Sequence, residues 1–154
     1  YCEAIAGLWN EQRRQRQYAL FLSLPIDDSK DQVAGHVSSH GGPTEGYDHS
    51  RSAAIGATPV VRGLTWRTLG FTYDGEEIRA FLDGRLDRRD GYNPQPLRGG
   101  IFNGDGDFTV GAVARERPPA GMGNFFAGDL AGLAVYARAL TTDEMSAMAT
   151  SSKR

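Results

Sequence analysis

Apolar and polar residues alternate along much of the chain with the two-residue period of a β-strand. This pattern, interrupted by segments rich in glycine and proline, predicts strands at residues 2–9, 18–25, 33–40, 66–75, 77–84, 108–113 and 125–136. Only the tail has a helical pattern, in which Thr141 and Glu144 have the spacing of a capping box. The chain is therefore predicted to be one all-β domain with a short C-terminal helical turn.

The strand predicted at 33–40 has faces of different character. Val33 and Val37 lie on one face, and His36, Ser38 and His40 lie on the other. If the valine face meets the core, the histidine face points to a concave surface or to solvent. Residues 41–63 are too rich in Gly, Pro and Ser for regular structure and are predicted to be a long loop.

A hairpin is predicted at residues 66–84, because Asp74-Gly75 is a strong turn signal between two alternating segments. In its second strand, Arg79 and Phe81 share one face. The opposite face carries three apolar residues, Ile78, Ala80 and Leu82.

Composition excludes several classes of protein. The 154 residues suffice for one domain with a real hydrophobic core, and the net charge of -2 gives no reason to expect nucleic acid or an anionic membrane. No apolar run approaches the ~20 residues of a membrane span. Cys2 is the only cysteine, so an internal disulfide is impossible. The chain opens with YCEAIAGLWNEQ, without the features of a signal peptide, and we expect a fragment of a longer protein.

Three segments follow one another along the second half of the chain: WRTLGFTYDGEEIRAFLDGRL, FTVGA and FFAGDLAGLAVYARALTTDEMSAM. Their order and spacing resemble the laminin-G-like, or concanavalin A-like lectin/glucanase, jelly roll over roughly residues 5–149. The motifs that carry the resemblance are Tyr73-Asp74-Gly75, Asp83-Gly84, Val110-Gly111, Phe126 with Gly128, and Ala139-Leu140.

The resemblance implies two antiparallel sheets packed face to face, in a domain of an exported protein at an extracellular, periplasmic or cell-surface location. It implies carbohydrate, or other domains of the parent protein, as partners. The family usually has one or two strands before the position of Tyr1, so an edge of the domain is expected to be either missing or supplied by another segment. Its final strand often carries an acidic pair that holds calcium. Here the matching positions are Ala131 and Gly132, with Asp129 nearby as a substitute.

A zinc site shared by His36 and His40 conflicts with their spacing. On a strand the two residues share a face but sit about 13 Å apart, too far to reach one ion at ~2 Å. Gly41-Gly42-Pro43 excludes the helix that would bring them together.

Catalysis finds little support in the sequence. No strand offers the alternating acidic residues that a glucanase of this superfamily needs on one face. A polysaccharide lyase would need a Tyr or His base and a cation, and His36, His40, Tyr47 and Arg51 supply these residue types without a motif that requires them.

A sugar-binding surface has better candidates. Aromatic plates beside hydrogen-bonding groups suit a sugar, which stacks its C–H face and pairs its hydroxyls. The predicted ligand-binding residues are Trp9, Glu11, His36, Ser38, His40, Tyr47, Arg79 and Phe81. The alternative is that Trp9 and Phe81 complete a core.

Calcium is the candidate cofactor. Oxygen ligands alternate with glycine at Asn103, Asp105 and Asp107, which together with Asp129 are the candidate ligands. Such runs are more often plain turns.

A basic run, Arg13-Arg14-Gln15-Arg16, forms a predicted hairpin tip. It could bind an acidic polysaccharide, but it lacks the interleaved aromatics typical of nucleic-acid binding. The leading hypothesis is thus a non-catalytic carbohydrate-binding module, the second is a structural or protein–protein scaffold, and the third is a polysaccharide lyase or glycoside hydrolase.

Overall fold

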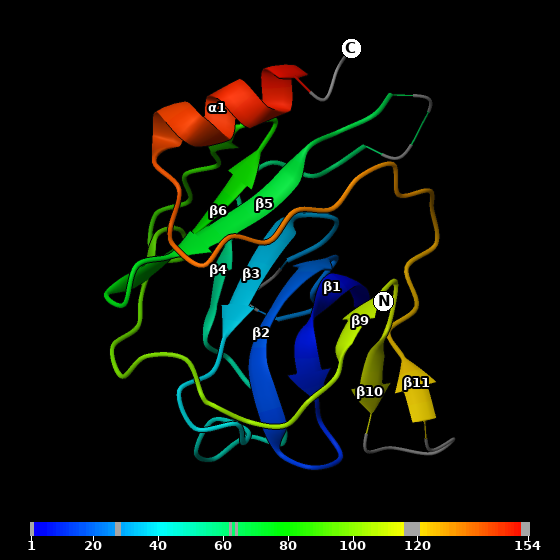
Figure 1. Cartoon of the computed structure of the whole chain (residues 1–154), viewed down its shortest axis with the longest axis vertical. Coiled ribbons are helices and arrows are strands. Elements are labelled where there is room, and N and C mark those ends of the chain that lie inside the picture. The colour runs from blue at the N-terminus through cyan, green and yellow to red at the C-terminus, as the bar shows by residue number, and fades with distance from the viewer. Residues whose placement is uncertain (1, 27–28, 62, 64, 116–120, 152–154) are drawn as a thin grey trace.

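The computed structural model describes residues 2–26, 29–61, 63, 65–115 and 121–151, which form two β-sheets and one helix (Figure 1). The larger sheet has the strand order β11-β10-β1-β2-β3-β4, and β9 also pairs with β1. Its strands are β1 (Glu3–Asn10), β2 (Gln15–Leu22), β3 (Val33–Val37), β4 (Ala53–Ile55), β9 (Phe108–Val110), β10 (Val113–Arg115) and β11 (Gly121–Gly123). All pairs in this sheet are antiparallel except β1 with β10.

The smaller sheet is built around β6 (Glu77–Leu82). β5 (Leu69–Tyr73) pairs with β6 along its length, while β7 (Arg85–Leu86) and β8 (Gln95–Pro96) pair with its two ends. The two sheets pack face to face as a jelly-roll sandwich. The predicted all-β architecture is confirmed.

The core between the sheets follows from the alternation in β3 and β6. Val33 and Val37 of the larger sheet meet Ile78, Ala80 and Leu82 of the smaller sheet in one buried cluster. These are the residues that the sequence pattern placed on the apolar faces of their strands. Burying them is the main hydrophobic contribution to the fold.

A second buried cluster lies on the other face of the larger sheet. It contains Trp9, Phe21, Ala34 and Ile55, which come from β1, β2, β3 and β4. Both faces of the central strands are therefore covered, and all five residues of β3 are buried.

Helix α1 (Thr142–Ser151) covers the outer face of the smaller sheet (Figure 1). The predicted capping box is present: Thr141 Oγ1 accepts from the Glu144 amide at 3.3 Å, and Glu144 accepts from the Thr141 amide at 2.8 Å. Met145 and Ala149 are its buried residues. No helix in the described part of the chain is long and apolar enough to cross a membrane.

The two aspartate-glycine motifs of the hairpin have clear structural tasks. Asp74 accepts hydrogen bonds from the backbone amides of Glu77 and Glu76, which together with Arg79 lower its pKa to about 2. Gly84 has φ +76° and lies against Ala149 of α1, where a Cβ atom would come within 2.8 Å of that side chain. The second motif therefore provides the close approach that α1 needs.

Three predicted boundaries differ from the structure. The strand predicted at 33–40 ends at Val37, because the Gly41 amide donates to Ser38 Oγ at 3.0 Å and turns the chain. The long loop predicted at 41–63 contains β4, whose short apolar stretch pairs with β3. The strand predicted at 125–136 does not form.

Residues 128–137 are an extended segment that lies outside both sheets, drawn in orange in Figure 1. The preceding Phe126 still donates to Gly111 O at 2.9 Å. Within the described part of the chain, residues 128–137 make no backbone–backbone hydrogen bond. Leu133, Val135 and Tyr136 are about half exposed. The segment predicted as a strand is rich in apolar residues, but a β-strand forms only where a neighbouring strand pairs with it.

Asn93 fills a gap beside β6 and is 1% exposed. Its side-chain amide donates to Ala80 O at 2.9 Å and to Asp87 O at 2.6 Å, and its Oδ1 accepts from the Ala80 amide at 2.9 Å. These bonds hold the loop before Pro94 against the sheet.

Asn93→Ala is expected to lower the free energy of unfolding by about 2–4 kcal/mol, because it leaves the buried Ala80 amide unpaired and removes two further hydrogen bonds, to Ala80 O and Asp87 O. Urea unfolding followed by tryptophan fluorescence measures this change. Asn103→Ala, at an exposed position, is the control and should change stability by less than about 0.5 kcal/mol. Equal stability of the two variants would contradict the role of Asn93.

Amides of residues 128–137 are expected to exchange with deuterium close to the unprotected rate. The amides that pair β2 with β3 should be protected by a factor of at least about 10³, since those bonds lie in the buried sheet. Hydrogen-exchange mass spectrometry on the same sample compares them. Equal protection of the two regions would mean that residues 128–137 have a hydrogen-bonding partner in solution.

Candidate functional site

Trp9 and His36 come from neighbouring parts of the larger sheet and lie in its second buried cluster. The Trp9 ring is 5.0 Å from the His36 ring and 5.6 Å from the Phe21 ring, centroid to centroid, with edge-to-face geometry in both pairs. Phe21 and His36 complete the triangle at 5.4 Å. The three rings stabilise one another and leave no open aromatic plate.

His36 is 1% exposed, so the expectation that its face points to an open surface is wrong. Burial, with smaller effects of Arg16 and His49, lowers the pKa of His36 to about 3. Its Nδ1 is buried without a hydrogen-bond partner among the described residues. A neutral, enclosed imidazole of this kind is a packing residue and a poor general base.

Ser38 is also buried and has a local structural role. Its hydroxyl accepts from the Gly41 amide at 3.0 Å, its amide donates to Gln17 O, and its carbonyl accepts from the Phe102 amide. Ser38 therefore connects β2, the loop after β3 and the segment around Phe102. The predicted polar strip of His36 and Ser38 is covered by the chain itself.

Arg79 and Phe81 lie elsewhere in the molecule. Both are on β6, on the face opposite the core residues Ile78 and Ala80, and thus on the outer side of the smaller sheet. Arg79 pairs with Asp74 and Glu77 at 2.7 and 2.6 Å, and Phe81 is 1% exposed. The structure does not bring these two residues together with Trp9 and His36.

Glu11 follows β1 at the start of the hairpin turn and is half-buried. Its carboxylate lies 3.9 Å from the Arg115 guanidinium. Because Trp9 is enclosed, it offers no exposed ring beside Glu11 on which a sugar could stack.

The loop after β3 carries the exposed part of the predicted set. His40 and Tyr47 are exposed, and Tyr47 has 48% of its surface accessible. The Arg51 guanidinium lies 4.8 Å from the centre of the Tyr47 ring, and the His49 ring lies 5.6 Å from it. His49 in turn bonds Asp48 at 2.8 Å.

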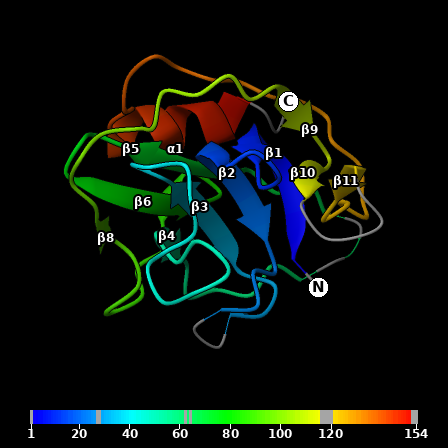
Figure 2. The ribbon, with the colours of Figure 1, turned by 90° about the horizontal axis from the view of Figure 1, so that it is seen from below.

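Backbone bonds make this loop compact. The Tyr47 amide donates to Thr44 O, the Thr44 amide donates to His49 O, and the Arg51 amide donates to Thr44 Oγ1. We call residues 39–51 the loop site. The loop site lies at the end of the larger sheet that faces the viewer in Figure 2. Within it, the Tyr47 ring contacts both the Arg51 guanidinium and the His49 ring.

The loop site contacts the hairpin turn at residues 11–14, which sequence reasoning missed. The Arg16 amide donates to Gly41 O at 3.2 Å, and Arg14 packs on Gly41 and Gly42. A Cβ atom at residue 42 would come within 2.7 Å of Arg14 Nη2. The glycine pair was the signal in the sequence, because adjacent glycines allow such close contacts.

The candidate calcium ligands do not converge. Asn103, Asp105, Asp107 and Asp129 are exposed, and the described residues contain no group of three or more His, Cys, Asp or Glu side chains arranged to hold a metal ion. Gln17 donates to Gly104 O at 2.9 Å, and Gln15 accepts from the Asp105 amide at 3.0 Å. The Asn/Asp/Gly run is an irregular connecting segment that is hydrogen-bonded to β2.

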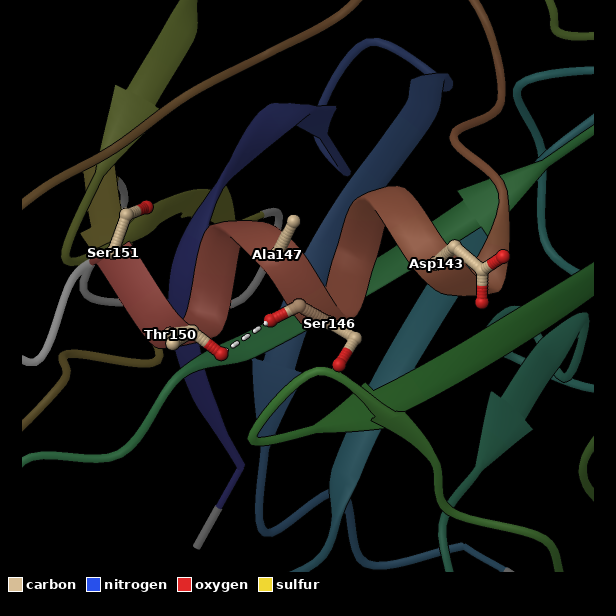
Figure 3. Close-up of a pocket in the computed structure, with 5 residues that line it drawn as sticks. All are labelled: Asp143, Ser146, Ala147, Thr150 and Ser151. Atoms are coloured by element: carbon tan, nitrogen blue, oxygen red, sulfur yellow. Dashed lines mark hydrogen bonds between the residues drawn. The ribbon is translucent and has the colours of Figure 1, made fainter.

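A shallow depression lies along α1 (Figure 3). It is lined by Asp143, Ser146, Ala147, Thr150 and Ser151, all from one helix. Thr150 Oγ1 donates to Ser146 O at 2.9 Å, as is common for a helical threonine. With no wall from another element, the depression lacks the convergent groups of a ligand site.

The family model described as the concanavalin A-like lectin/glucanases superfamily, of laminin G type, matches residues 12–146. The chain belongs to this superfamily. No curated protein matches the chain. A crystal structure of an S-layer domain-containing protein from Clostridium thermocellum is similar at 13% identity and a TM-score of 0.37. That match covers 96% of this chain and 63% of the other.

The enclosed imidazole predicts a pH dependence of stability. The pKa of His36 is lower in the folded chain than its usual 6.5, so the unfolded state binds more protons between pH 6.5 and about 3. The contribution of His36 to stability should therefore fall as the pH falls through this range, by on the order of 4 kcal/mol at pH 3.

His36→Phe should flatten this part of the stability curve, because phenylalanine does not titrate. Urea unfolding at several pH values measures the difference between the two proteins, and His40→Phe, at an exposed position, is the matched control. The same pH slope in wild type and His36→Phe would show that His36 is not enclosed.

Proposed function

We propose that the chain is a non-catalytic carbohydrate-binding module of a larger, exported protein, and that it binds its ligand through the loop site. Membership of the concanavalin A-like superfamily supports a binding role, although a fold alone does not fix a function. The specific support comes from the side chains of residues 39–51.

The observation that carries the proposal is the environment of Tyr47. Its ring is about half exposed yet held by Arg51 and His49, so it loses little conformational freedom on binding. A sugar that stacks on the accessible part of the ring would have charged and polar groups within reach for its hydroxyls. This combination favours a sugar over a purely apolar ligand.

The titratable groups with strongly shifted pKa values favour binding over catalysis. His36 and Cys2 are shifted mainly by burial, which also raises the pKa of the Cys2 thiol to about 12. The pKa of Asp74 is lowered mainly by the backbone amides of its turn, and that of Glu144 is lowered mainly by Arg138 and then by the helix-cap amide of Thr141. Each shift has a structural cause, and none of these four side chains belongs to the loop site.

A structural or protein–protein scaffold is the second candidate. It is favoured by the enclosed Trp9, Phe21 and His36, which remove the sheet face as a binding surface. The exposed apolar side chains of residues 128–137 also support the scaffold hypothesis, since apolar patches often mark interaction surfaces.

Tyr47→Ala is expected to reduce affinity for glycans at least tenfold, because the stacking surface is lost. A glycan array finds the ligand, and calorimetry on the hits measures affinity. Single-site binding should be weak, with Kd on the order of 1 mM or about -4 kcal/mol, as in modules that act by tethering.

Tyr136→Ala is the matched control, because Tyr136 is 49% exposed but lies outside the loop site. It should leave glycan affinity unchanged. Absence of binding to every glycan would refute the carbohydrate proposal and leave the scaffold, whereas equal losses in both variants would place the site elsewhere.

A further inference from the structure

The hairpin turn between β1 and β2 presents two adjacent cations. Arg13 and Arg14 are both exposed, and neither has an ion-pair partner among the residues that the structure describes. Most other arginines in the described ranges are paired, as Arg79 is with Asp74 and Glu77. Two neighbouring guanidinium groups without carboxylates repel each other and attract anions.

The turn is fixed in position against the loop site. The Arg16 amide donates to Gly41 O at 3.2 Å, and the Arg14 guanidinium lies against Gly42. The Arg14 amide also donates to Glu11 O at 3.2 Å, with Arg14 itself at φ +53°. The cation of Arg14 is therefore held beside residues 40–42, which lowers the entropic cost of using it for binding.

His40 adds a directed donor next to Arg14. Its Nδ1 accepts from the Gly42 amide at 3.2 Å. The neutral imidazole then carries its proton on Nε2, so this nitrogen of an exposed side chain can donate a hydrogen bond. Gly42 contacts both residues, so the Arg14 guanidinium and the His40 ring flank the same backbone segment.

Acidic side chains also lie at this end of the molecule. Glu45 and Asp48 are exposed in the loop site, and the exposed Asp105 lies in the segment bonded to Gln15. Among the described residues none of these carboxylates pairs with Arg13 or Arg14, since Glu11 lies near Arg115 and Asp48 bonds His49. The attraction of an anion therefore comes from the two guanidinium groups themselves and not from a general positive field.

We propose that the ligand is an anionic polysaccharide, whose carboxylate or sulfate groups are bound by Arg13, Arg14 and His40 while a sugar ring stacks on Tyr47. This inference rests on the proposed carbohydrate-binding function and names its ligand class. Guanidinium groups bind the oxygen atoms of carboxylates and sulfates with paired hydrogen bonds, which gives more specificity than a general positive field. Because the charges of such a polymer repeat along its length, one polymer molecule could place successive anionic groups against the turn and the loop site.

The test measures binding of the whole chain to three polymers by affinity electrophoresis and calorimetry. Alginate carries carboxylates, dextran sulfate carries sulfates, and dextran is the neutral reference. Wild type should bind at least one anionic polymer at least tenfold more tightly than dextran. The R13Q/R14Q variant should lose at least tenfold in that affinity, and its dependence on salt should become shallower. The preferred polymer identifies the anion.

The R85Q/R88Q variant is the control, because it removes the same charge from exposed arginines beyond the hairpin of the smaller sheet. It should bind like wild type. Circular dichroism and thermal unfolding establish that both variants are folded, and H40A, which leaves the turn intact, provides an independent variant with a smaller expected loss.

The outcomes separate the two proposals. Binding of dextran and the anionic polymers with equal affinity would overturn this inference but leave carbohydrate binding standing. No binding to any of the polymers or to a glycan array would overturn both. Equal losses in R13Q/R14Q and R85Q/R88Q would show non-specific attraction only and would also overturn this inference.

Discussion

The fold depends on the burial of both faces of β3. One face meets the smaller sheet through Val33 and Val37, and the other packs Ala34 and His36 among residues of the second cluster. A strand buried on both sides has a tightly specified register, because a shift by one residue would exchange the two sets. Gly35 contributes to this constraint, since the Phe71 ring of the smaller sheet occupies the space where a side chain would be.

The same constraint determines where recognition can occur. A concave sheet face is available to a ligand only if nothing covers it, and here Trp9, Phe21 and His36 are enclosed. The ends of the strands remain, where the turn at 11–14 and residues 39–51 meet through Arg14, Gly41 and Gly42. Binding residues in such places are positioned by the sheet without belonging to its core.

Residue patterns predicted the architecture well, because alternation reports which side of a strand is apolar. They placed Ile78, Ala80 and Leu82 on one face of their strand, which is the face that enters the core, and the spacing of Thr141 and Glu144 predicted the helix cap. The family match to residues 12–146 confirms the resemblance. These features are local, or repeat with a fixed period.

The candidate site was harder to predict, because exposure depends on what other segments cover. Polar character suggested that His36 faces solvent, but His36 is buried among Trp9 and Phe21, which are distant in sequence. Alternation likewise marked residues 125–136 as apolar without showing whether a neighbouring strand exists. The contact of Arg14 with Gly42 is also non-local, and only the glycine pair hinted at it.

Asn93 shows how a loop can complete a sheet without becoming a strand. Its side-chain amide presents one N–H and one C=O group to Ala80, as a peptide group of a paired strand would. β7 and β8 contact only the ends of β6, and this side chain substitutes for main chain in the gap between them. Aspartate could not do the same, because a carboxylate accepts but does not donate. At Ala80 the sheet edge is thus continued by one side chain together with the Asp87 amide, which donates to Ala80 O at 3.1 Å, so the loop completes the edge without a run of paired residues.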